Sequence, residues 1–200
     1  FSDATLGSSQ GLPTKFSEAD LSNAVFSGAT IGSSDFQFAS FNCTGFTGTD
    51  ISQSIFGPQL KLNDDGCRTS FKYAVMSCEF VAQWKDLDLT GATVQNCDGS
   101  LDGKAFDGAM MDGVVFSTLS LTNTSWKGAS IERAYFVASD LTKAVFDGAH
   151  AKLGQFSQAT LTGATFVNTT LNGAVLVGAT LNGADLSGAI LQSDGTTAAG

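Results

Sequence analysis

The sequence is poor in charge, in proline and in histidine. Charged residues make up 14% of its 200 residues, and there are 2 prolines and 1 histidine, whereas about 25% of a typical soluble domain is charged. Ten basic residues stand against 19 acidic ones, so the net charge is −9. This acidity argues against direct binding to nucleic-acid phosphates or to an anionic membrane surface.

Long apolar runs and catalytic motifs are also missing. No run approaches the ~18 apolar residues of a membrane-spanning helix, so no membrane insertion is expected. There is no Gly-x-Ser-x-Gly, no Walker loop and no His-Glu-x-x-His. The single histidine, His150, cannot build a conventional catalytic triad or a zinc site alone. The sequence therefore predicts a protein that is not an enzyme and that binds no cofactor or metal.

What the sequence does contain is a repeat of five residues. Almost every fifth position from 1 to 191 holds a large apolar residue, and 14 of the 16 phenylalanines occur there. A period of five fits neither an α-helix, where successive repeats turn by ~140°, nor a straight strand, where they alternate between faces. The chain must therefore bend once per repeat, which predicts a solenoid of stacked coils with the large residues inside.

Aromatic residues recur at every second repeat, most clearly between 101 and 166. An even number of sides per coil would place them on alternating sides. With four sides, residues 20 apart stack directly. The expected columns are Phe16, Phe36 and Phe56; Phe106, Trp126, Phe146 and Phe166; and Leu101, Leu121, Leu141, Leu161 and Leu181.

This repeat resembles that of the pentapeptide-repeat family, whose pattern is A-(D/N)-L-x-x. The stretch from Ala159 to Leu191 carries it best, as ATLTG-ATFVN-TTLNG-AVLVG-ATLNG-ADLSG-AIL, and the resemblance covers 1–56 and 101–191. It implies an all-β fold, a right-handed four-sided parallel β-helix of about nine coils. We expect one such domain over 1–191, interrupted by an irregular segment near 57–100, and a flexible tail at 192–200.

The interruption contains the candidate interaction residues. Segment 57–70 combines Pro58 with Asn-Asp-Asp-Gly and reads as an excursion from the coil, and 81–88 is a second candidate. Irregular loops on a rigid scaffold often carry function, which singles out Asp64, Asp65, Arg68, Trp84 and Lys85. The alternatives are a tolerated insertion, a Trp84 that folds back over the coil, and a calcium site at 63–66, which lacks the spaced ligands of an EF-hand.

All four cysteines, Cys43, Cys67, Cys78 and Cys97, lie in or beside this segment. Each of the pairs 43/67 and 78/97 is separated by about one coil, and equivalent residues of stacked coils lie ~4.8 Å apart, close enough for a disulfide. Bridges Cys43–Cys67 and Cys78–Cys97 are therefore one hypothesis, and unbridged cysteines that fill small inward sites are the other. Bridges would indicate an oxidising compartment: secreted, periplasmic or an organelle lumen.

Function is expected at the surface, because stacked large residues leave no obvious substrate cavity. The leading interpretation is a non-enzymatic structural or protein-interaction module, which presents flat polar sides and the excursion to a protein or glycan partner. The C-terminal coils, where charge is nearly absent, are a candidate contact with a second copy. Asp102, Asp107 and Asp112 should face three directions and accept local backbone N–H groups as turn residues.

Two other functions fit the sequence less well. Some members of the family resemble B-DNA in shape and charge and bind DNA gyrase or topoisomerase, so the resemblance implies an acidic DNA mimic as the alternative. The acids at 20, 35, 50, 140 and 185 fall on four different sides, unlike the charge of a duplex. Ice binding by a flat threonine array is less favoured, because Thr160, Thr165 and Thr180 form no long ladder.

Overall fold

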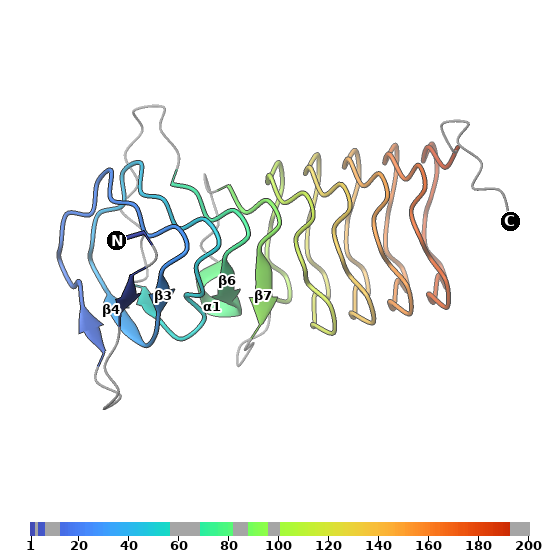
Figure 1. Ribbon diagram of the computed structural model, residues 1–200. Coiled ribbons are helices and arrows are strands. Elements are labelled where there is room, and N and C mark those ends of the chain that lie inside the picture. Colours follow the sequence, from blue (N-terminus) through green and yellow to red (C-terminus); the bar gives the residue numbers. More distant parts are fainter. Residues whose placement is uncertain (3, 7–12, 57–68, 82–87, 96–100, 193–200) are drawn as a thin grey trace, which may run out of the picture. The chain divides into compact units, whose positions relative to one another are not determined.

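The computed structural model describes residues 1–2, 4–6, 13–56, 69–81, 88–95 and 101–192. The chain forms two compact units, Phe1–Gly99 and Ser100–Gly200 (Figure 1). The single domain over 1–191 and the flexible tail at 192–200 stay predictions.

The first unit is built from short parallel strands. Its described elements are β1 (Thr5–Leu6), β2 (Thr14–Lys15), β3 (Thr30–Ile31), β4 (Ser34–Phe36), β5 (Ile55–Phe56), β6 (Val75–Ser77), α1 (Cys78–Val81) and β7 (Thr93–Gln95). β1 pairs with β3, β4 pairs with both β2 and β5, and β6 pairs with β7, always in parallel. Parallel pairing of segments one coil apart is what a solenoid requires.

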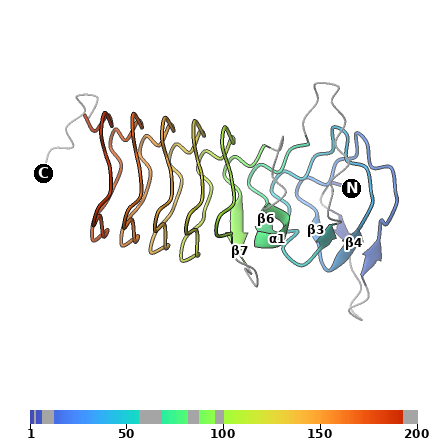
Figure 2. The ribbon, with the colours of Figure 1, turned by 180° about the vertical axis from the view of Figure 1, so that it is seen from behind.

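In the second unit, the described residues form no strand of two or more residues. Single parallel bridges join the coils instead. A bridge occurs at every fifth residue and joins it to the residue one coil later, from Ala105 with Ser125 to Thr170 with Ile190. Four bridges per coil make four sides, and Figures 1 and 2 show the successive turns of this unit. The predicted four-sided parallel β-helix is confirmed.

A tight turn at each corner explains how the chain bends. In a typical corner the Ala109 N–H donates to the Phe106 carbonyl at 3.1 Å, and Gly108 between them has a φ of 69°. A positive φ at the third residue is the mark of a type II turn, which favours glycine there. Between coils, the Phe106 N–H donates to the Ser125 carbonyl at 2.6 Å, so backbone hydrogen bonds link neighbouring coils.

Thr118 occupies a corner with a φ of 63°, where the Leu119 N–H donates to the Ser139 hydroxyl at 3.2 Å, and this φ is unfavourable for a β-branched residue. Thr118→Gly is therefore expected to raise the free energy of unfolding by about 1 kcal/mol. The matched control is Thr122→Gly, because Thr122 is not among the residues with positive φ and glycine there only adds chain entropy to the unfolded state. Urea denaturation should move the two midpoints in opposite directions; a lower midpoint for Thr118→Gly would contradict this account.

The core consists of stacked aromatic rings. In the first unit Phe16, Phe36 and Phe56 stack with centroids 4.8 and 5.0 Å apart. In the second unit the column runs Phe106, Trp126, Phe146, Phe166, with successive centroids at 4.3, 6.0 and 4.8 Å. These two columns are as predicted from the period. A further column in the second unit, Phe116, Phe136 and Phe156, meets the column of Trp126 and Phe146 edge to face, so the inside of these coils is filled with rings.

The interruption is narrower than the predicted segment 57–100. Residues 69–81 and 88–95 continue the coils: Gly45 bridges to Ser70, Ser70 bridges to Asp88, and β6 pairs with β7. Leu89 and Val94, five residues apart, are buried. The five-residue pattern changes register here, because the coil lengths differ. The coil from Asp50 to Val75 is five residues longer than a regular one, and the coil from Val75 to Thr93 is two residues shorter.

Candidate functional site

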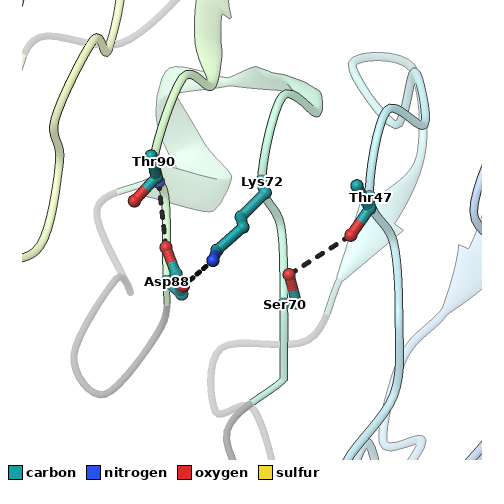
Figure 3. Close-up of polar contacts among 5 residues, drawn as sticks. All are labelled: Thr47, Ser70, Lys72, Asp88 and Thr90. Atoms are coloured by element: carbon teal, nitrogen blue, oxygen red, sulfur yellow. Dashed lines mark hydrogen bonds and ion pairs between the residues drawn. The ribbon is translucent and has the colours of Figure 1, made fainter.

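A polar cluster joins three neighbouring coils of the first unit, next to segments 57–68 and 82–87. Lys72 Nζ lies 3.2 Å from Asp88 Oδ2, and the Thr90 N–H donates to Asp88 Oδ1 at 3.1 Å (Figure 3). The Thr47 and Ser70 hydroxyls face each other at 3.3 Å.

The electrostatics of Asp88 indicate a clamp between coils. Its partial burial disfavours the charged carboxylate, but hydrogen bonds from the Thr90 hydroxyl, the Thr90 N–H and Lys72 outweigh the burial, so the pKa of Asp88 lies below its ordinary value. The carboxylate is therefore ionised at neutral pH and already has partners on both oxygens. Such a group is poorly suited to accept a proton from a substrate.

Cys43 and Cys78 are both disulfide-bonded, and no described cysteine is a free thiol. Cys43 itself occupies a corner, with a φ of 57°, and Cys78 is buried at the start of α1. The other two cysteines, Cys67 and Cys97, lie outside the described residues. The pairing Cys43–Cys67 and Cys78–Cys97 therefore stays a prediction.

A disulfide peptide map under non-reducing conditions should recover Cys43 linked to Cys67 and Cys78 linked to Cys97. Intact mass should rise by four hydrogens on reduction, because two bridges open. Cys43→Ser with Cys67→Ser should leave the second bridge in place, which serves as the control. Crossed pairs or four free thiols in the oxidised protein would show the predicted pairing to be wrong.

The predicted interaction loop lies outside the described residues. Asp64, Asp65 and Arg68 belong to segment 57–68, and Trp84 and Lys85 to segment 82–87. The calcium alternative at 63–66 lies there too. The described residues just beyond these segments are those of the polar cluster, Ser70 and Asp88, which sequence reasoning did not single out.

The aspartates of the second unit bind the next coil. Asp102 Oδ1 accepts the Thr122 N–H at 2.7 Å and the Ser120 hydroxyl at 2.8 Å. Asp107 and Asp112 accept N–H groups of Lys127 and Glu132 in the same way. The prediction of local turn bonds was wrong for these three, because each carboxylate accepts the N–H of the equivalent residue in the next coil, 20 positions further on. They lie at successive repeats and therefore on three different sides, as predicted.

Local bonds occur instead at the aspartates that lie at the bridged positions of the ladder, such as Asp140 and Asp185. Asp140 accepts the N–H and the hydroxyl of Thr142, at 3.0 and 2.6 Å. Asp185 accepts both groups of Ser187, and these bonds lower its pKa. Most of the described acidic groups thus already bind protein donors, which leaves few of them free to receive a ligand.

One side of the second unit carries no charge. We call the residues 115–118, 135–138, 155–158 and 175–178 the uncharged side, since none of them is Asp, Glu, Lys, Arg or His. Each of the other three sides carries both acidic and basic residues, for example Asp107 with Lys127. The net charge of the whole chain does not reveal this side; comparing residues at intervals of 20 does.

Candidate catalytic and metal groups are dispersed. In the part of the chain that the structure describes, no three residues among His, Cys, Asp and Glu converge to hold a metal ion. His150 is exposed on an outer ladder between Ser130 and Thr170. Over the same residues, no helix has the length and apolar character that a membrane span needs.

Comparison with known proteins points to one kind of repeat. A family model described as pentapeptide repeats matches in eight copies, over residues 19–57 and 155–192. No curated protein matches the chain in sequence. Among solved structures, the chain is similar to HetL, a pentapeptide repeat protein involved in heterocyst differentiation regulation in the cyanobacterium Nostoc, with 20% identity over 98% of this chain and 92% of that one and a TM-score of 0.42.

Two further structures are similar. One is a pentapeptide repeat protein of the Arabidopsis thaliana thylakoid lumen, with 26% identity over 51% of this chain and 63% of that one and a TM-score of 0.33. The other is QnrB1, a plasmid-mediated fluoroquinolone resistance protein, with 17% identity over 93% of this chain and 73% of that one and a TM-score of 0.37.

Proposed function

Because this chain belongs to the pentapeptide-repeat family, we propose that it is a non-enzymatic structural and protein-interaction module. The observation that carries this proposal is the regular wall of the second unit, where every side is a parallel ladder held by backbone hydrogen bonds between coils. Such a wall holds its outward side chains at fixed spacing, so a partner meets a surface that loses little entropy on binding.

Two surfaces are available to a protein partner. The first is the set of flat sides of the second unit. The second is the proposed interaction loop with Asp64, Asp65, Arg68, Trp84 and Lys85, whose flanking coils are joined by Lys72 and Asp88. The bonded state of Cys43 and Cys78 supports an oxidising compartment for this interaction.

The experiment uses the full chain as bait against an extract of its own source, with crosslinking and mass spectrometry to locate contacts. A matched bait replaces 57–68 by a Gly-Ser linker of equal length. Crosslinks lost with the replacement would place the partner at the loop, and crosslinks that remain would place it on the flat sides. A chain that captures nothing above the level of an unrelated acidic protein would refute the proposal.

The alternative function is an acidic DNA mimic that binds gyrase or topoisomerase, and the net charge of −9 is what favours it. A duplex mimic needs acidic groups concentrated along a face, whereas Asp102, Asp107 and Asp112 lie on three sides and bind protein donors. We therefore expect no effect on gyrase supercoiling at micromolar protein. Inhibition of supercoiling, or protection of gyrase from a quinolone, would favour the DNA mimic over the interaction module.

A second copy was also predicted as a partner through the C-terminal coils. In the last described coil the large residues Leu176, Leu181 and Leu186 are half-buried, and Leu191 is 55% exposed. Leu171, in the coil before, is buried. This contact remains a proposal, and light scattering that shows a monomer at high concentration would exclude it.

A further inference from the structure

Steps in which Asn or Asp precedes Gly are chemically reactive, and the second unit has six of them among its described residues. In each step the backbone nitrogen of the glycine can attack the side-chain carbonyl carbon of the residue before it, because glycine has no Cβ to hinder the approach. The steps begin at Asp102, Asp107, Asp112, Asp147, Asn172 and Asn182. Every glycine involved has a positive φ at a corner of the coil, so the contacts of each corner decide whether its step can react.

The four Asp-Gly steps are held at both reacting groups. In the first of them the Asp102 carboxylate accepts the Thr122 N–H at 2.7 Å, and the Gly103 N–H donates to the Thr122 carbonyl at 2.8 Å. The other three steps make the same two bonds to the coil that follows. The carboxylate and the glycine nitrogen of each step are therefore fixed to one residue of the next coil, and they meet only if the ladder opens there.

The two Asn-Gly steps share the same local sequence, Leu-Asn-Gly-Ala, at 171–174 and at 181–184. The first step is held through its side chain, because the Asn172 amide donates to the Gln192 carbonyl. Its glycine is also covered, since a Cβ on Gly173 would lie 2.7 Å from Leu153 Cδ2. A difference in reactivity between the two steps would thus come from the structure and not from the neighbouring residues.

The second Asn-Gly step has none of these restraints in the part of the chain that the structure describes. Asn182 is exposed, and neither its side chain nor the Gly183 N–H has a hydrogen-bond partner among those residues. A Cβ on Gly183 would meet nothing within 4 Å. The Asn182 carbonyl accepts the Gly163 N–H at 2.9 Å, so this corner is tied to the coil before it alone and opens more readily than the others.

We propose that Asn182 is a site of spontaneous deamidation in the folded protein. The Gly183 nitrogen bonds to Asn182 Cγ, the bond from Cγ to Nδ2 breaks, and the amide nitrogen leaves as ammonia with the Gly183 proton. Water then opens the cyclic imide at one of its two carbonyls, which gives aspartate or isoaspartate. Either product adds a carboxylate to this side of the unit, beside Thr162 and Thr180, and isoaspartate also lengthens the backbone by one methylene. This modification goes beyond the interaction module and does not depend on it.

Incubation of the folded full chain at mildly alkaline pH, followed by peptide mapping with chymotrypsin, tests the proposal. Cleavage after leucine separates the two sites into peptides 172–176 and 182–186. We expect 182–186 to gain aspartate and isoaspartate about five- to tenfold faster than 172–176, the factor that one net hydrogen bond gives. The control is the same incubation in urea, where the coils are lost and the two identical steps should react at equal rates.

Matched variants identify the reacting residue. Labelling of the folded chain by an isoaspartate methyltransferase should disappear with Asn182→Gln, because glutamine closes the larger ring far more slowly, and should persist with Asn172→Gln. Circular dichroism checks that both variants keep the fold. Equal rates at the two sites in the folded chain, isoaspartate that forms first at an Asp-Gly step, or no reaction at Asn182 when the urea control reacts would each overturn the proposal.

Discussion

Phe136→Ala is expected to lower the free energy of unfolding by about 3–5 kcal/mol, the range for removing a fully buried ring. The Phe136 ring stacks between Phe116 and Phe156, at 5.8 and 5.2 Å, and meets Trp126 and Phe146 edge to face. The rings above and below are fixed to coils held apart by backbone hydrogen bonds, so they cannot collapse into the space that is left. The urea midpoint measures the loss.

The control for this prediction is Phe38→Ala. Phe38 is one of the two phenylalanines outside the five-residue register, and it is 55% exposed at a corner. Its replacement should change the free energy of unfolding by less than about 0.5 kcal/mol. Equal losses for the two variants would mean that the stacked column does not stabilise the fold more than the surface does.

Thr124→Val is expected to cost about 1–3 kcal/mol, although threonine and valine have the same shape. The Thr124 hydroxyl donates to the Leu121 carbonyl at 2.7 Å and accepts the Trp126 indole N–H at 2.9 Å, and both side chains are buried. Valine leaves the indole N–H without an acceptor inside the core. Thr124→Ser keeps the hydroxyl and should lose much less, which provides the matched control.

A double-mutant cycle distinguishes the lost hydrogen bond from altered packing. Trp126→Phe removes the indole donor, so Thr124→Val should cost clearly less in that background than in the parent chain. Denaturation followed by circular dichroism measures all four proteins. If the cost of Thr124→Val is the same in both backgrounds, the bond between these side chains contributes nothing to stability.

The sequence predicted the parts of the fold that repeat. Large residues at every fifth position required one bend per repeat, and the alternation of aromatics predicted that Phe106 and Trp126 would stack. These features follow from side-chain size alone, which a sequence states directly.

What could not be predicted depends on backbone geometry between coils. The coils that contain residues 69–81 and 88–95 differ in length from the regular ones. The pairing of Ser70 with Asp88 and of β6 with β7 shows that these residues belong to the stacked coils. Whether an aspartate binds its own turn, like Asp140, or the next coil, like Asp102, is decided by distances across the ladder. The uncharged side emerges only when residues one coil apart are read together, and this requires the coil length to be known.

The coils of unequal length show how this architecture can change. The path from Asp50 to Val75 takes five residues more than a regular turn, yet both ends keep their parallel bridges and Phe46 still stacks on Phe71 at 4.9 Å. The five extra residues are thus accommodated without disturbing the rungs on either side. A coil of this kind is a natural insertion point, at which evolution or an engineer could graft a new recognition segment while the scaffold keeps its register.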